Sequence, residues 1–182
     1  VIRACGLDAS LAMLLAPWVA NGSRELKMNI IGTIENLGDV RGGPALRLAV
    51  LDDEEVVAEA ALQALEKINF TGAGPLIIKA CQIRRKQHPD HEKFLATACQ
   101  ILGRWTPEEA VPFLLEMARK KSVLPLAGRA PTLAVRLAAI QALGHYESPQ
   151  VWQFMERLTQ ENNPDLQELL DELIRQRISD RE

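Results

Sequence analysis

Apolar and small residues recur along this chain at the spacing of an amphipathic helix. In the clearest segments they occupy positions i, i+3, i+4, i+7 and i+8, which lie on one face of an α-helix. Two such stripes are Val57, Ala60, Ala61, Ala64 and Leu65, and Val135, Ala138, Ala139, Ala142 and Leu143. No window alternates between apolar and polar residues as a half-buried strand does. The pattern therefore predicts an all-α protein.

The stripes repeat along the sequence, and each ends near a large aliphatic residue that we call its anchor. The four anchors are Ile34, Leu65, Leu102 and Leu143. Successive anchors lie about 31, 37 and 41 residues apart, within the range that is typical of helical repeats. A fifth, weaker stripe has a charged opposite face, as expected of a terminal helix that meets water. Its residues are Leu166, Leu169, Leu170, Leu173 and Ile174.

Proline marks the start of a second helix before each of the later stripes. It costs no hydrogen bond at the first position of a helix, because the N–H there has no partner within the helix. The marked starts are Gly43-Pro44, Gly74-Pro75, Thr106-Pro107, Ser148-Pro149 and Asn163-Pro164. Thr106 to Glu109 has the order of a capping box, and Asp53 and Asp90 stand where caps of the stripe helices are expected. Pro112 lies past the first turn of its helix, so we expect a kink there.

These signals predict one curved domain, a right-handed α-α superhelix, or solenoid, of about five helix pairs. A partial first repeat covers 1–22, and a capping helix covers 163–182. The repeats between them are 23–52, 53–88, 90–121 and 131–161. The tryptophans Trp18, Trp105 and Trp152 fall on the apolar phase of their helices, so we expect them in the core.

The order of residues in the first repeats resembles that of a known family. Leu37-Gly38-Asp39 is followed by Pro44-Ala45-Leu46, then by Leu51-Asp52-Asp53 and the stripe that ends at Leu65. This order is similar to the bacterial HEAT-repeat family that includes the phycobilisome-lyase-type repeats. The resemblance covers nearly the whole chain and implies the HEAT fold. Family members often open the second helix with Val-Arg, which only Val135-Arg136 keeps, so we expect no regular Asp/Arg ladder between repeats.

Composition and charge narrow the possible partners. The 182 residues are 47% hydrophobic, 25% charged and 4% aromatic, with a net charge of −3. A chain with a net negative charge lacks the positive electrostatic potential on which non-specific nucleic-acid binding relies, so a nucleic-acid partner is disfavoured. The longest apolar run, Leu11 to Ala20, contains Pro17 and is shorter than the roughly 20 residues of a membrane span. We therefore expect no membrane partner.

The cysteines indicate a cellular compartment, and the first residues indicate how the chain begins. Cys5, Cys81 and Cys99 have no CxxC spacing, which is typical of buried thiols in a reducing, cytoplasmic compartment. The chain opens at Val1 in mid-pattern, like the end of a helix. We therefore expect it to be part of a longer polypeptide.

The resemblance also brings in catalytic relatives, and the residues do not support them. HEAT-like deoxyhypusine hydroxylases use His-Glu pairs inside the second helix, whereas the single pair here, His91-Glu92, lies at a helix start. With only His88 and His145 besides, several converging metal ligands are not expected. No spacing supports Ser/His/Asp or Cys/His catalysis, and nothing singles out the chromophore site of a phycobilin lyase. We expect no enzyme activity, no metal and no cofactor.

HEAT-like DNA glycosylases are the main alternative, because they would use a basic face with a nearby aromatic residue. The candidates are Arg84, Arg85, Lys86 and Lys93, with Trp105 in the next turn. We favour the simpler interpretation of a solvated charge run beside a core tryptophan. A lyase or metal-hydroxylase relative is a weaker alternative.

The remaining function is recognition of a partner through the exposed face of the stripe helices. In a solenoid of stacked helix pairs this face is concave. The candidate partner-binding residues are Glu35, Glu59, Gln63, Glu66, Gln100, Leu137 and Gln141. The face is acidic in its N-terminal half and more apolar in its C-terminal half, which suits a protein or peptide with basic residues at one end and an aliphatic anchor at the other. Alternatively, the glutamates only keep the helices soluble and Leu137 packs between repeats. The connection from Lys120 to Pro131 is a second candidate site.

Overall fold

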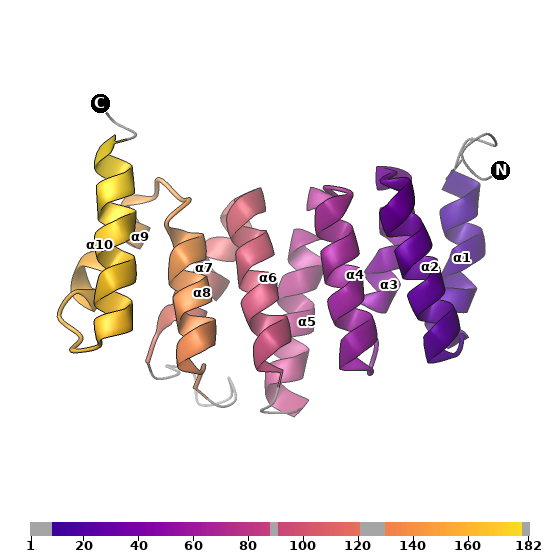
Figure 1. Ribbon diagram of the computed structural model, residues 1–182, viewed down its shortest axis with the longest axis horizontal. Helices are drawn as coiled ribbons and strands as arrows, with labels where there is room; N and C mark the ends of the chain where they lie inside the picture. Colours follow the sequence, from indigo (N-terminus) through magenta and orange to yellow (C-terminus); the bar gives the residue numbers. More distant parts are fainter. Residues whose placement is uncertain (1–8, 88–90, 121–129, 180–182) are drawn as a thin grey trace. The chain divides into compact units, whose positions relative to one another are not determined.

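The computed structural model describes residues 9–87, 91–120 and 130–179. Every regular element in these ranges is helical, which confirms the predicted all-α class for the described chain (Figure 1). Its helices are α1 (Ala9–Asn21), α2 (Arg24–Leu37), α3 (Gly43–Ala49), α4 (Glu55–Lys67), α5 (Gly74–Gln87), α6 (Glu92–Trp105), α7 (Val111–Ala118), α8 (Leu133–Leu143), α9 (Pro149–Leu158) and α10 (Pro164–Ser179). Short 3-10 turns at Val40–Gly42, Thr71–Ala73 and Glu108–Ala110 lead into α3, α5 and α7.

The chain divides into two compact units, Val1–Arg84 and Arg85–Glu182. In the first unit α1 packs against α2 and α3, and α4 packs against α2 and α3. The predicted stripe of α4 faces this core: Val57, Ala61, Ala64 and Leu65 are fully buried. Small alanine side chains let neighbouring helices approach closely while the aliphatic residues leave water.

The second unit is organised around α8, which packs against α6, α7 and α10. The α8 stripe from Val135 to Leu143 is buried. Tyr146, just after α8, donates hydrogen bonds from its hydroxyl to the carbonyl oxygens of Leu102 (3.1 Å) and Pro107 (3.2 Å). Its ring thereby ties the end of α6 to the segment that follows α8.

Four of the five proline-marked helix starts are confirmed. Pro44 lies in the first turn of α3, α5 begins at Gly74, and α9 and α10 begin at Pro149 and Pro164. The side chain of Asn163 accepts a hydrogen bond from the N–H of Leu166 (3.0 Å) and so caps α10.

The predicted start at Thr106-Pro107 is wrong. Thr106 is the C-terminal cap of α6 and adopts a left-handed backbone conformation (φ 49°). A residue that ends one helix in this way cannot also accept the N-terminal hydrogen bonds of the next, so the capping box does not form. A 3-10 turn follows Pro107, and α7 begins only at Val111. Pro112 therefore lies in the first turn of α7, and the kink predicted there is also wrong.

The cap predicted at Asp53 does not form, because Glu54 is the cap residue of α4 and no side chain caps this helix. The Oδ1 atom of Asp52 accepts a hydrogen bond from the backbone N–H of Glu54 (3.0 Å), at the start of α4. Asp53 is exposed. The predicted cap at Asp90 lies outside the described residues.

The three tryptophans have different environments. Trp152 is buried, as predicted, and its Nε1–H donates to the carbonyl oxygen of Tyr146 (3.0 Å). Trp105 is half-buried. Trp18 is 60% exposed, so its assignment to the core is wrong. Because α1 is apolar on nearly every side, its sequence does not show which side faces inward, and Val19 is the residue that packs.

Two of the three cysteines belong to the described core. Cys81 and Cys99 are buried thiols, as predicted, and Cys5 lies outside the described residues. Burial raises the pKa of Cys99 to about 12, although Arg85 acts weakly in the opposite direction. A thiol with so high a pKa is an unreactive packing residue at neutral pH.

No helix in the described part of the chain is long and apolar enough to cross a membrane.

Candidate functional site

The first unit brings four of the seven candidate partner-binding residues onto two neighbouring helices. Glu35 lies on α2, and Glu59, Gln63 and Glu66 lie on α4, which packs against it. Gln63 is exposed and the three glutamates are half-exposed. The helical period explains this, because these positions lie opposite the buried stripe. We call these four residues the acidic face.

One cation already lies at the edge of the acidic face. Lys67 donates from Nζ to Oε1 of Glu35 (2.9 Å), and both side chains remain open to water. An exposed ion pair of this kind contributes little to stability, about 0.2–1 kcal/mol. It does show that a lysine from outside α2 can reach Glu35, which is the type of contact that a basic partner would make.

The second unit carries the other three candidates. Gln100 lies on α6, and Leu137 and Gln141 lie on α8, the helix that packs against α6. Both glutamines are exposed, and Leu137 is half-buried. The end of α8 carries no acidic residue beside Gln141, so this surface is less charged than the acidic face, in line with the gradient along the sequence.

The structure also shows polar contacts at a repeat position outside the predicted partner-binding residues. Seven residues before the anchors, the chain carries Lys27, Ala58, Leu95 and Arg136. The two cations at this position, Lys27 and Arg136, each make a partly buried ion pair within their own unit. The two apolar residues are buried in the core. Ion pairs thus occur at two of the four equivalent positions, and they do not form the regular Asp/Arg ladder between repeats.

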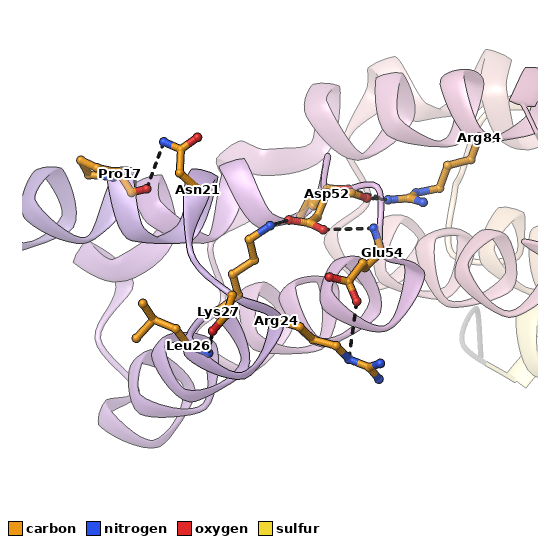
Figure 2. A network of polar contacts seen from close by, with 10 residues as sticks. Pro17, Asn21, Arg24, Leu26, Lys27, Asp52, Glu54 and Arg84 are labelled. Carbon is orange, nitrogen blue, oxygen red and sulfur yellow. Dashed lines mark hydrogen bonds and ion pairs between the residues drawn. The ribbon is translucent and has the colours of Figure 1, made fainter.

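Lys27 forms the contact in the first unit (Figure 2). Its Nζ donates to Oδ2 of Asp52 at 2.6 Å, and the two side chains are only 12% and 8% exposed. The same carboxylate accepts a hydrogen bond from the backbone N–H of Glu54, just before α4, while the backbone carbonyl of Asp52 accepts one from Arg84. Asp52 thus joins α2, the start of α4 and the end of α5 in one polar cluster.

Arg136 forms the corresponding contact in the second unit. Its Nε donates to the carbonyl oxygen of Ala118 (3.0 Å), at the end of α7. Its Nη2 lies between both carboxylate oxygens of Glu161 (3.1 and 3.0 Å). A guanidinium that is buried in this way is paired and hydrogen-bonded, so it supports the packing and is not offered to a ligand.

The basic run considered for nucleic-acid binding is not a solvated charge run. Arg84 is buried and donates to the carbonyl oxygens of Val50 and Asp52. The side chain of Arg85 is only 6% exposed, and its Nη1 donates to Glu116 (2.9 Å). That interpretation is therefore wrong for both arginines, whose charges serve structural contacts. The side chain of Lys86 lies outside the described residues, and Lys93 is exposed.

The other candidate positions do not converge. His91 is the N-terminal cap residue of α6, Glu92 and His145 are exposed, and His88 lies outside the described residues. Among the described residues, no three His, Cys, Asp or Glu side chains are grouped closely enough to hold a metal ion. The connection between Lys120 and Pro131 lies almost wholly outside the described part.

Comparison with known proteins adds no assignment: no family model matches the sequence, and no curated protein is similar to it.

Proposed function

We propose that this chain is a protein-binding HEAT-repeat module, a scaffold or regulatory part of a longer cytoplasmic polypeptide. In this proposal the helix pairs stack as a right-handed solenoid, and the exposed sides of α2, α4, α6 and α8 form the concave surface that receives the partner. The proposed partner is a protein or peptide segment with basic residues and an aliphatic anchor.

The observation that carries the proposal is the acidic face of the first unit. Its three glutamates and Gln63 point away from a core that is otherwise closed by aliphatic side chains. Arg84 and Arg85, the two arginines of the run considered for nucleic-acid binding, are held in structural contacts instead. The charge of the acidic face therefore favours a basic partner over a nucleic acid.

The test is charge reversal on the acidic face. The variant Glu59→Arg with Glu66→Arg replaces two attractions with two repulsions, so the affinity for a basic twelve-residue peptide should fall roughly tenfold or more. The matched control is Glu168→Arg with Glu172→Arg, because both residues are exposed on α10 and the change in net charge is the same. Circular dichroism checks that both variants remain folded.

Equal affinities of the two variants would contradict the proposal, because the loss would then follow net charge and not the acidic face. Binding of duplex DNA that falls steeply with salt would favour the glycosylase-type alternative instead.

A further inference from the structure

One repeat position carries the same amide side chain three times. Two residues before the anchors, the chain has Gly32, Gln63, Gln100 and Gln141. The three glutamines are all exposed. Solubility alone requires only a polar residue at this position, whereas an amide differs from a charge in offering both a hydrogen-bond donor and an acceptor.

The second unit places two of these amides on adjoining helices. Gln100 lies on α6 and Gln141 on α8, and these two helices lie side by side (Figure 1). Gly103 brings them close together, because a Cβ atom at this residue would lie 2.6 Å from the Cα of Ala142. Among the described residues, neither glutamine side chain has a hydrogen-bond partner. The two amides thus occupy equivalent positions on neighbouring helices and are available to a ligand.

Apolar side chains accompany the two glutamines. Ala96 on α6 and Leu137 on α8 precede them by one helical turn, and both are half-buried. Leu133, one turn earlier on α8, is 38% exposed. We call these five residues the amide face. It combines two uncharged hydrogen-bonding groups with an aliphatic floor.

We propose that the amide face binds an extended peptide segment, whose main chain exchanges hydrogen bonds with Gln100 and Gln141 while its aliphatic side chains lie on Leu133 and Leu137. This inference rests on the proposed function and specifies its partner. A peptide unit has one N–H and one C=O, which is the complement of a glutamine amide. A partner helix uses these groups internally, so it would leave both glutamines without main-chain contacts.

The helix spacing fits such a segment. Packed helices lie about 8–10 Å apart, and an extended chain advances about 3.3 Å per residue. Peptide units about three residues apart would therefore meet successive glutamines. Neutral amides bind the main chain of a peptide whatever its sequence, so selectivity would come from the aliphatic side chains.

The experiment compares two probes on the full chain. One is a flexible twelve-residue peptide with lysines at one end and alternating leucines at the other, and the second is the same sequence stapled into a helix. The flexible peptide should bind at least roughly tenfold more tightly. Gln100→Ala with Gln141→Ala should weaken its binding by roughly five- to tenfold, the loss expected for two hydrogen bonds. Gln150→Ala with Gln153→Ala, two exposed positions on α9, should leave it unchanged.

The outcomes separate this inference from the proposed function. If Glu59→Arg with Glu66→Arg weakens binding but the Gln100 and Gln141 variant does not, the acidic face stands and the amide face is wrong. Equal or tighter binding of the stapled helix would also overturn the amide face. If neither probe binds the full chain, both proposals fail.

Discussion

At the scale of single residues, two glycines within stripe helices have opposite surroundings. A Cβ atom at Gly32 would meet nothing within 4 Å, whereas at Gly103 it would collide with the backbone of Ala142. Glycine costs about 0.5–1 kcal/mol relative to alanine inside a helix, because it loses more conformational freedom on folding. Close helix packing therefore requires glycine at position 103 but not at position 32.

The first prediction follows from this contrast. Gly32→Ala should raise the free energy of unfolding by about 0.5–1 kcal/mol. Gly103→Ala should lower it by about 1–3 kcal/mol, because α6 and α8 must move apart. Urea titrations of the two variants check this, and each serves as the control for the other. A destabilised Gly32→Ala variant would mean that its surroundings are more crowded than described.

The second prediction concerns alkaline pH. The folded pKa of Cys99 is raised to about 12, so the unfolded thiol ionises first, near its ordinary value of 9.0. The unfolded state then binds fewer protons than the folded state, and stability falls as pH rises through this window. The loss should reach about 1 kcal/mol at pH 10, one pKa unit above the unfolded value. Burial raises the pKa of the Tyr146 hydroxyl as well, which adds a loss at still higher pH.

Urea midpoints at pH 8 and pH 10 measure this effect. Cys99→Ala lowers stability at both values, because a buried side chain becomes smaller, but it should show a smaller difference between them. An unchanged difference would show that other groups cause the alkaline loss.

At the scale of elements, the start of α4 depends on one carboxylate. Asp52 accepts a hydrogen bond from the N–H of Glu54, the residue before α4, and pairs with Lys27 on α2. Asp52→Ala should therefore lower the free energy of unfolding by about 3 kcal/mol, since it removes a turn hydrogen bond and leaves a partly buried ammonium without its partner. Asp53→Ala, the adjacent exposed position, should change it by less than about 0.5 kcal/mol. Thermal unfolding monitored by circular dichroism distinguishes the two.

The helix starts show what local sequence can predict. Proline in the first turn is a local requirement of the backbone, so Pro44, Pro149 and Pro164 mark their helices correctly. The prediction at Thr106 was wrong because this residue lies between two helices, and it caps the end of α6 in a left-handed conformation. Asp52 and Asp53 are chemically equivalent in the sequence. Only the position of Lys27, 25 residues away, distinguishes them.

At the scale of the whole molecule, exposure was easier to predict than pairing. The helical period places Gln63, Gln100 and Gln141 on the outside, and all three are exposed. The arginines could not be placed in this way, because Arg84 and Arg85 lie next to each other and their partners are far away in the sequence. Burial of such a charge depends on a carbonyl or carboxylate that only the fold supplies.

The two proposed faces should respond differently to salt. Contacts of a basic peptide with the acidic face are screened, because the Debye length shrinks from about 10 Å at 0.1 M to about 3 Å at 1 M salt. Hydrogen bonds to the uncharged amide face are not screened by salt. Binding of the basic peptide should therefore weaken with salt, and Glu59→Arg with Glu66→Arg should flatten this dependence while Gln100→Ala with Gln141→Ala should preserve it. Calorimetric titrations across the salt range provide the measurement.

The placement of Trp18 supplies an optical reporter that needs no label. An indole in water emits at longer wavelength and is quenched by acrylamide, whereas Trp152 is shielded by the guanidinium of Arg177, 3.8 Å from its ring centre. In a Trp105→Phe background, which removes the half-buried third indole, emission from the quenchable fraction would thus monitor anything that binds to α1, while the protected fraction would follow the integrity of the second unit in the same sample.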